Sequence, residues 1–328
     1  MNLDFSNNLF KEKVLSIKSV NYENNNSSED AFLIILDGLE FEMIENLCNE
    51  LAIKLSINSY EVYKLIQSKK IPKKLLLETA YELIHNNIYL GNKIDDKKLN
   101  CSAWLSHCLY EGEVASNLAS IMNLNPDTAC KLGILHDVGR KFTHSFIHTI
   151  KGYEYLVNLG YNDEAIACLT HSFLPVFNNE NIKGNRCANC DPALEGFYVN
   201  DDGEGVFQEE NQKDDIAKFL DNYQYNNYDI ILNISDLMAT STSIISPYER
   251  MIDVYSRRII DPTNSPFFKV CYINTLFKIL YLITLDNKYM KNYNIKNVDN
   301  IDELLQEISN TFMNIYNSLI ISKKRFSL

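Results

Sequence analysis

The sequence is poor in glycine and contains none of the common glycine-based catalytic loops. Only 11 of its 328 residues are glycine, and no glycine-rich run precedes a Lys-Ser or Lys-Thr pair. Such a run is needed to cradle the phosphates of a nucleoside triphosphate. A Gly-x-Ser-x-Gly turn is also missing, so neither a phosphate-binding loop nor nucleophilic serine catalysis is supported.

Long apolar runs are missing as well, and no secretory leader is expected. Residues 1–20 mix charged and apolar side chains, which is not the pattern of a secretory leader. The most apolar late stretch, residues 266–285, is interrupted by Lys269 and Lys278, so it falls short of the roughly 20 apolar residues of a membrane span. Eight cysteines without regular spacing suit a reducing compartment. We expect a cytoplasmic protein with no membrane partner.

Positive charge is scarce in the chain. Lys and Arg number 31 against 43 Asp and Glu, a net charge of -12, which argues against a surface that blankets nucleic acid or anionic lipid. Apolar residues make up 46% of the sequence, enough for a substantial core, so wholesale disorder is excluded. Small-molecule substrates remain open.

The first hundred residues are predicted to form a mostly helical accessory region. Within them, residues 47–72 have the apolar spacing of a helix-turn-helix, and residues 51–74 carry six lysines against one glutamate. Helix pairs of ordinary bundles have the same pattern, and the acidic net charge counts against DNA. A ligand-sensing regulator built on this segment is therefore kept as an alternative.

One helix is predicted to turn a histidine toward the core. Five of the six histidines lie between positions 107 and 171. The first belongs to a stripe whose members are three or four residues apart and so share one helical face. The stripe consists of Trp104, His107, Glu111, Val114, Leu118 and Ile121.

The other histidines are predicted on the helices that follow. Asn125 and Pro126 form a typical helix start, and Gly139 is expected to end that helix soon after His136. The next helix stops at Gly160. Asp163 can cap the one after it, which carries His171.

Four motifs follow one another in a fixed order. They are Trp104-x-x-His107, then Gly133-Ile134-Leu135-His136-Asp137-Val138-Gly139-Arg140, then His148 followed by Gly152-Tyr153, and finally Thr170-His171-Ser172-Phe173. This series resembles the HD-domain superfamily of metal-dependent phosphohydrolases, and its His-Asp-Val-Gly stretch resembles the HDIG subgroup. The resemblance covers about residues 101–260 and implies a mostly α HD-domain helical bundle. Beyond it, apolar periodicity predicts C-terminal helices over residues 261–328.

The resemblance also implies a dinuclear metal centre. By analogy, one metal is held by His107, His136, Asp137 and Asp236, and a second by His148 and His171 with Asp137 as the bridge. Asp236 lies in Ile234-Ser235-Asp236-Leu237-Met238-Ala239, and Asp229 is the alternative for its role. Imidazole-rich ligation favours two divalent transition-metal ions among Fe, Mn, Co, Ni and Zn.

Several neighbours of these residues are candidates for substrate binding or proton transfer. Arg140, Lys141 and Lys151 are expected to grip phosphate oxygens, with plain surface charge as the other interpretation. His144 is a substrate contact or an exposed bystander. Glu111, one helical turn beyond the first histidine, is expected to be a catalytic proton carrier together with Asp137 or a carboxylate that orients a metal ligand. A buried carboxylate paired elsewhere is the other interpretation.

An acidic insertion is predicted at about residues 176–228. Residues 191–221 carry ten acids and two lysines, typical of a solvated segment. Cys187 and Cys190 have the spacing of half a zinc site, but no second pair lies near them in the sequence. The alternatives are a structural zinc site and two free thiols.

These observations lead to a hypothesis of function. We expect a metal-dependent phosphohydrolase that uses a metal-bridging hydroxide to hydrolyse a small phosphorylated substrate, such as a nucleotide or a related phosphoester or phosphoanhydride. An HD-type di-iron oxygenase has the same ligand series and is the alternative enzyme. A regulator with an N-terminal helix-turn-helix is the alternative outside catalysis.

Overall fold

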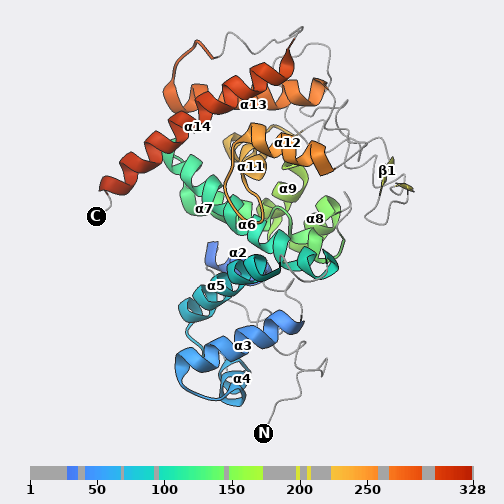
Figure 1. Cartoon of the computed structure of the whole chain (residues 1–328), viewed down its shortest axis with the longest axis vertical. Coiled ribbons are helices and arrows are strands. Elements are labelled where there is room, and N and C mark those ends of the chain that lie inside the picture. The colour runs from blue at the N-terminus through green and yellow to red at the C-terminus, as the bar shows by residue number, and fades with distance from the viewer. Residues whose placement is uncertain are drawn as a thin grey trace.

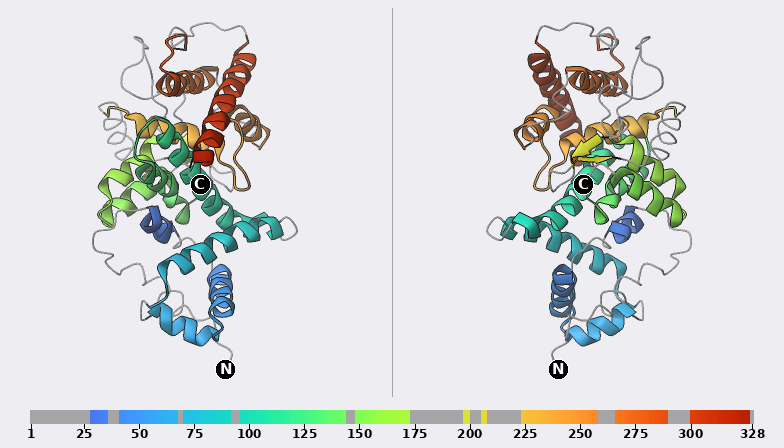
Figure 2. Two further views of the ribbon diagram at one scale, coloured as in Figure 1. Left: turned by 90° about the vertical axis from the view of Figure 1, so that its left-hand side faces the viewer. Right: turned by 90° about the vertical axis from the view of Figure 1, so that its right-hand side faces the viewer.

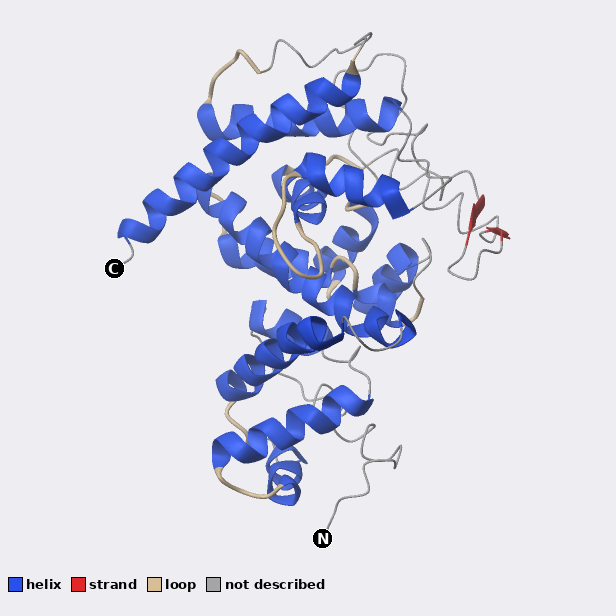
Figure 3. Ribbon diagram, in the orientation of Figure 1, coloured by secondary structure: helices blue, strands red, loops and turns tan. Residues whose placement is uncertain are grey.

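The computed structural model describes residues 28–35, 41–67, 70–91, 96–143, 148–172, 197–199, 205–207, 223–257, 266–289 and 300–326. These residues are mostly helical, which confirms the predicted fold class (Figure 3). The exception is a small antiparallel hairpin of β1 (Phe197–Val199) and β2 (Gly205–Phe207). His144, Cys187 and Cys190 lie outside the described residues, as does most of the acidic insertion.

Four helices form the N-terminal part of the described chain. They are α2 (Ser28–Ile35), α3 (Phe41–Leu55), α4 (Ser59–Gln67) and α5 (Lys73–Gly91). Helices α3 and α4 lie at the opposite end of the molecule from the C-terminal helices (Figures 1 and 2). Helix α5 connects this end to the centre, where it packs on the next helix of the chain. The predicted helical character of this region is confirmed.

The central helices carry the histidine motifs. They are α6 (Asp96–Ile121), α7 (Pro126–Leu135), the short 3-10 helix η3 (Val138–Lys141), α8 (His148–Asn158), α9 (Asn162–Thr170) and α11 (Asn227–Met238). Helix α6 continues across the boundary predicted at residue 100, and the division into domains stays a prediction. The side chain of Asn125 accepts hydrogen bonds from the first-turn N–H groups of α7, so the predicted start of that helix is confirmed.

Two local predictions were wrong. Gly139 does not end α7, which stops at Leu135; it lies inside η3, where its backbone meets that of α8. Asp163 does not cap α9, because Tyr161 is the N-cap residue and no side-chain cap is formed. The predicted stop at Gly160 is confirmed, since this glycine follows α8 with a φ of 85°.

The C-terminal helices cover α11 and the C-terminal half of α6. They are α12 (Pro247–Arg257), α13 (Pro266–Thr284) and α14 (Ile301–Phe326). In Figure 1, α13 and α14 cross above α11 and α12. No helix among the described residues has the length and apolar character needed to cross a membrane.

The buried side chains form two apolar clusters, and α6 runs through both. Trp104 and Leu105 belong to the first cluster, which also contains residues of α2 to α5. Val114 and Leu118, two turns further along, belong to the second, which contains residues of α11 to α14. His107 and Glu111 lie between these pairs and are buried. The polar residues of α6 are therefore placed at the junction of the two clusters.

Candidate metal centre

The six predicted metal ligands come from five helices and the turns between them. His107 lies within α6, His136 is the C-cap of α7, and Asp137 is the N-cap of η3. His148 begins α8, His171 is the C-cap of α9, and Asp236 lies in the last turn of α11. All are buried except Asp236, whose side chain is 28% exposed.

Two glycines allow α6 and α7 to approach closely enough to build the site. A Cβ placed on Gly133 would lie 2.9 Å from the backbone of Gly112, and a Cβ on Gly112 would lie 3.1 Å from the carbonyl oxygen of Cys130. Larger residues there would push the helices apart. The close approach brings Glu111 Oε2 within 2.8 Å of His136 Nε2.

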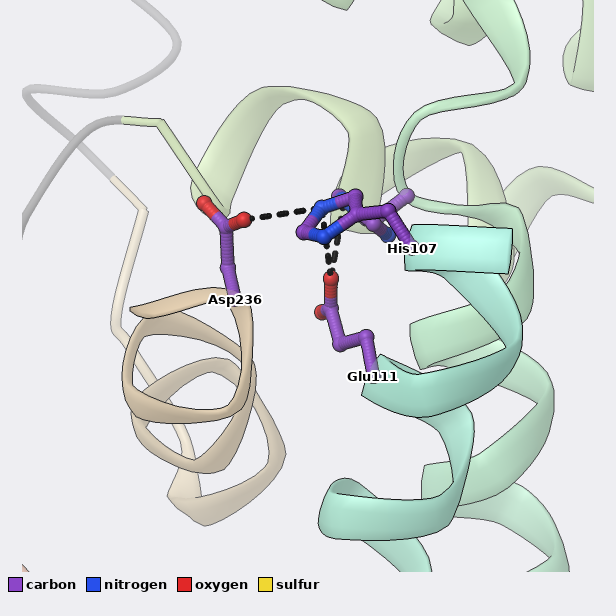
Figure 4. Close-up of side chains that lie close together, drawn as sticks. His107, Glu111 and Asp236 are labelled. Carbon is purple, nitrogen blue, oxygen red and sulfur yellow. Dashed lines mark ion pairs between the residues drawn. The ribbon is translucent and has the colours of Figure 1, made fainter. Parts of the chain in front are cut away.

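The first group of ligand atoms joins α6, α7 and α11. Its atoms, which lie within 4.8 Å of one another, belong to His107, Glu111, His136 and Asp236. His107 Nε2 lies 3.0 Å from Asp236 Oδ1 and 3.8 Å from Glu111 Oε2. Figure 4 shows the carboxylates of Glu111, on α6, and Asp236, on α11, both pointing toward the His107 imidazole. Neighbouring ligands of one cation with bonds of about 2.0 to 2.2 Å lie roughly 3 to 3.5 Å apart, so these atoms could share an ion.

The second group is centred on Asp137. Its Oδ1 lies 2.8 Å from His148 Nε2 and 3.5 Å from His171 Nε2, and these two nitrogens are 3.4 Å apart. Oδ2 of the same carboxylate turns the other way, 3.6 Å from His136 Nε2 and 3.9 Å from His107 Nε2. Asp137 therefore presents one oxygen to each group.

Backbone carbonyls fix the orientation of three of the imidazoles. His107 Nδ1 lies 3.2 Å from the Ala239 carbonyl oxygen, His136 Nδ1 lies 2.6 Å from that of Gly133, and His171 Nδ1 lies 3.1 Å from that of Ala167. A carbonyl only accepts hydrogen bonds, so Nδ1 must carry the proton and Nε2 keeps its lone pair. This arrangement is typical of metal-bound histidine.

Several atoms at the centre are buried without a hydrogen bond. Among the described residues they include both carboxylate oxygens of Glu111, Nε2 of His136 and Oδ1 of Asp137. Burying unpaired polar atoms is costly, and a cation bound at either group would satisfy the imidazole nitrogen or carboxylate oxygen that faces it. The donor set, neutral imidazoles with carboxylates, is also the kind that divalent transition metals accept. The residues present thus fit a metal centre.

The electrostatics favour the protonation states that bind cations. Burial disfavours the charge of Asp137, but Arg140 and the surrounding histidines outweigh it and hold its pKa well below the usual range. Burial likewise opposes ionisation of Asp236, yet the hydrogen bond with His107 lowers its pKa. Burial and the neighbouring His136 lower the pKa of His171 to about 3. Charged carboxylates and neutral imidazoles are the ligand forms that metals require.

Glu111 behaves differently from the two aspartates. Burial raises its pKa to about 8, against the opposing attraction of His136. For His136, burial is outweighed by Glu111 and Asp137, so its pKa is raised. Without a cation, each side chain of this fully buried pair therefore shifts the pKa of the other.

The residues predicted to bind phosphate are placed unequally. Arg140 Nε contacts Asp137 Oδ2 directly, beside the candidate centre. Lys141 Nζ lies 3.4 Å from the Tyr155 hydroxyl and over its ring, and Lys151 pairs with Glu154 at 2.9 Å. Of the three, Arg140 is the one whose charge reaches the centre through a contact found among the described residues.

Asp229, the alternative to Asp236, has a structural role. Its Oδ2 accepts the N–H of Asn226 and the hydroxyl of Tyr223, both at 2.8 Å, and its Oδ1 accepts the Thr170 hydroxyl at 2.8 Å. Together with Asn226 it forms the capping box at the start of α11. Asp236, two turns later, is the aspartate that the structure brings to the histidines.

Some contributors to the site were not predicted from the sequence. The Ser172 hydroxyl lies 2.8 Å from His171 Nε2, and its only sequence signal was its position next to a histidine. The three orienting carbonyls carry no signal at all, because every residue has one. Comparison with known protein families, with curated proteins and with solved structures found no match for this chain.

Proposed function

We propose that the chain is a metal-dependent phosphohydrolase of the HD type, acting on a small phosphorylated substrate such as a nucleotide. The observation that carries the proposal is the position of Asp137, which offers one carboxylate oxygen to each of two groups of histidines. A single structural ion would need only one such group. A shared carboxylate between two groups suits a dinuclear centre.

In this proposal His107, His136 and Asp236 hold one divalent transition-metal ion, while His148 and His171 hold the second and Asp137 bridges the two. When bound, two such cations supply hydroxide at neutral pH and neutralise charge on a phosphate. The buried histidines and carboxylates leave little room for other solvent to reach these atoms.

The chain's own groups can bind the substrate and handle its protons. Arg140 contacts Asp137 and its side chain is 27% exposed, so its guanidinium can reach a phosphate bound beside that carboxylate. Asp137, which its low pKa keeps ionised at neutral pH, is placed to orient an attacking water by accepting its hydrogen bond. Glu111, with a pKa of about 8, can retain a proton at Oε2 beside His136 at neutral pH.

Anaerobic turnover tests this proposal against the alternative. Protein reconstituted with manganese or cobalt in place of iron should release phosphate from nucleotides or related phosphoesters without dioxygen, because hydrolysis needs no change of oxidation state. Arg140→Ala should slow release about tenfold or more while metal content stays constant. Lys288→Ala, at an exposed lysine whose recorded ion pair is with Asp286, is the matched control and should change neither.

The opposite result would favour the di-iron oxygenase. That enzyme would require iron, consume dioxygen in proportion to product, and stay inert with manganese. Absence of phosphate release from nucleotides, phosphosugars and cyclic dinucleotides, together with a di-iron spectrum that bleaches in dioxygen, would reject the phosphohydrolase.

A further inference from the structure

The turn between α3 and α4 is short and fully specified by its own residues. Ser56 has a φ of 55°, and its N–H donates to the Ile53 carbonyl oxygen at 3.0 Å. The N–H of Ile57 donates to the Ala52 carbonyl oxygen, also at 3.0 Å. This pair of bonds around a left-handed residue is a common helix C-cap. Helix α3 therefore ends sharply at Leu55.

Helix α4 begins after a turn of only three residues, and its start is fixed as well. The Asn58 side chain accepts the N–H of Glu61 at 2.9 Å, as a helix N-cap does. The Ser59 hydroxyl donates to the side chain of Asn49 in α3 at 2.9 Å. The end of α3 and the start of α4 are both capped, and a hydrogen bond joins the two helices. The angle between α3 and α4 is therefore determined by residues in and beside the turn.

The inner faces of α3, α4 and α5 form a three-helix unit, defined here as residues 41–91. Leu51 and Val62 are completely buried, and Ala52 is buried beside them. Leu77 and Ala80 contribute from α5, and all five belong to one apolar cluster. Helix α3 packs on both α4 and α5, and the three-residue turn between α3 and α4 has the length found in a helix-turn-helix.

The outer face of α4 is exposed and polar. Tyr60 is 47% exposed, and the side chains of Glu61 and Lys64 are about half exposed. Lys64 Nζ lies over the Tyr60 ring, 4.3 Å from its centre, and 3.0 Å from Glu61. Since α4 lies at the end of the molecule, away from α13 and α14 (Figures 1 and 2), this face is accessible to a large partner.

The charge of this segment is opposite to that of the whole chain. Residues 51–74 hold six lysines and one glutamate, a net charge of +5, whereas residues 41–91 as a whole hold six lysines and six glutamates and the chain carries -12. The ion pairs of Lys54 with Glu82 and of Lys64 with Glu61 are solvent-exposed. Exposed pairs contribute little, so phosphate groups can compete for both lysines.

We propose that this three-helix unit binds duplex DNA, with α4 in the major groove. The major groove is about 12 Å wide and admits one α-helix. Local positive charge beside an exposed, capped helix favours a polyanion that has such a groove, which is duplex DNA. Tyr60 and Lys64, on the outer face of α4, contact bases and phosphates. The acidic remainder of the chain restricts the contact to this end. The inference does not depend on the proposed hydrolysis.

Selection from a randomised pool tests the proposal with the full-length protein. The pool contains duplexes with 20 random base pairs, and affinities of the selected and scrambled duplexes are measured by fluorescence anisotropy at several salt concentrations. We expect a common enriched sequence that binds about 100-fold or more tightly than a scrambled duplex. Lys64→Met should weaken binding to both duplexes and reduce the salt slope by about 1.

Matched variants separate a loss of contact from a loss of fold. Tyr60→Ala should weaken the selected duplex about tenfold or more, and thermal unfolding should show that both α4 variants are folded. Lys288→Ala, an exposed lysine that follows α13 at the other end of the molecule, should bind like the unaltered protein. The proposal is overturned if no sequence is enriched, if both α4 variants bind like the unaltered protein, or if single-stranded RNA is preferred over the duplex.

Discussion

The candidate metal centre and the three-helix unit of α3 to α5 are built in opposite ways. The centre brings together residues from position 107 to position 236, buries them, and leaves ligand atoms without hydrogen bonds. The α3–α4 turn is made by neighbours in sequence, from Ile53 to Glu61, and its polar groups are satisfied by caps. The centre therefore depends on the whole fold and could hold an ion, whereas the turn depends on its own residues.

The largest effect should follow from removing the shared carboxylate. Asp137→Ala should reduce bound metal from two equivalents to none, because the residue faces both groups of histidines. His148→Ala should remove mainly the second ion, since it contacts one oxygen of that carboxylate. Elemental analysis after anaerobic purification measures both. Retention of two equivalents by Asp137→Ala would reject the shared ligand and reduce the centre to independent sites.

A backbone contact beneath the centre should be the next most sensitive. A Cβ on Gly139 would lie 2.6 Å from the Gly152 backbone nitrogen and closer still to the His148 carbonyl oxygen. Backbone cannot move aside cheaply, so Gly139→Ala should destabilise the protein by about 3 kcal/mol or more. Gly160→Ala is the control: no atom crowds that Cβ, and the positive φ alone costs about 1 kcal/mol. Denaturant unfolding compares the two, and equal losses would contradict the packing argument.

Metal binding should stabilise one region and leave the other unchanged. At a free metal concentration of 100 times Kd, linkage gives about 2.7 kcal/mol of added stability. Hydrogen exchange should show this protection in the helices that supply ligands, α6 to α9 and α11, and a chelator should reverse it. Amides of α3 and α4 should exchange alike with and without metal. Equal protection of α3 and α4 would show that the two regions unfold as one unit.

The accuracy of the sequence predictions follows the same division. Caps and periodicity act over a few residues, so the start of α7 at Asn125 and the inward stripe of α6 could be predicted and are confirmed. Gly139 was misinterpreted as a helix stop because its real constraint is the backbone of α8, which is remote in sequence. Asp163 is of a residue type that often caps helices, yet Tyr161 occupies the N-cap position of α9.

For the candidate site, the sequence alone could predict the types of residue that serve as ligands, but not the geometry that brings them together. Asp229 and Asp236 are seven residues apart, and spacing alone could not choose between them, because the choice depends on which turn of α11 faces His107. The carbonyl oxygens of Gly133, Ala167 and Ala239 could not be predicted, since the path of the backbone decides which imidazole they meet. The proposed metals and their chemistry stay predictions.

Within the three-helix unit, the N-cap of α4 should have a moderate and purely local effect. Asn58→Ala removes the acceptor of the Glu61 N–H and should cost about 1 kcal/mol. Thermal unfolding measures this loss of stability. The metal content of the same variant should stay constant, because the change lies outside the candidate metal centre. A change in bound metal would mean that the α3–α4 turn and the candidate metal centre are coupled.

The smallest expected effect is a gain in stability at Ser56. Its φ of 55° strains any side chain with a Cβ, at a cost of roughly 1 to 2 kcal/mol. Glycine removes this strain but loses more conformational entropy on folding, by about 0.5 to 1 kcal/mol. Ser56→Gly should therefore stabilise the protein by about 0.5 kcal/mol, without altering metal content. Thermal unfolding of Ser56→Gly and Asn58→Ala in one experiment should show a gain in stability for the first variant and a loss for the second. A loss of stability in Ser56→Gly would show that the serine side chain makes a contact worth more than the strain, and the turn would then not be specified by its backbone alone.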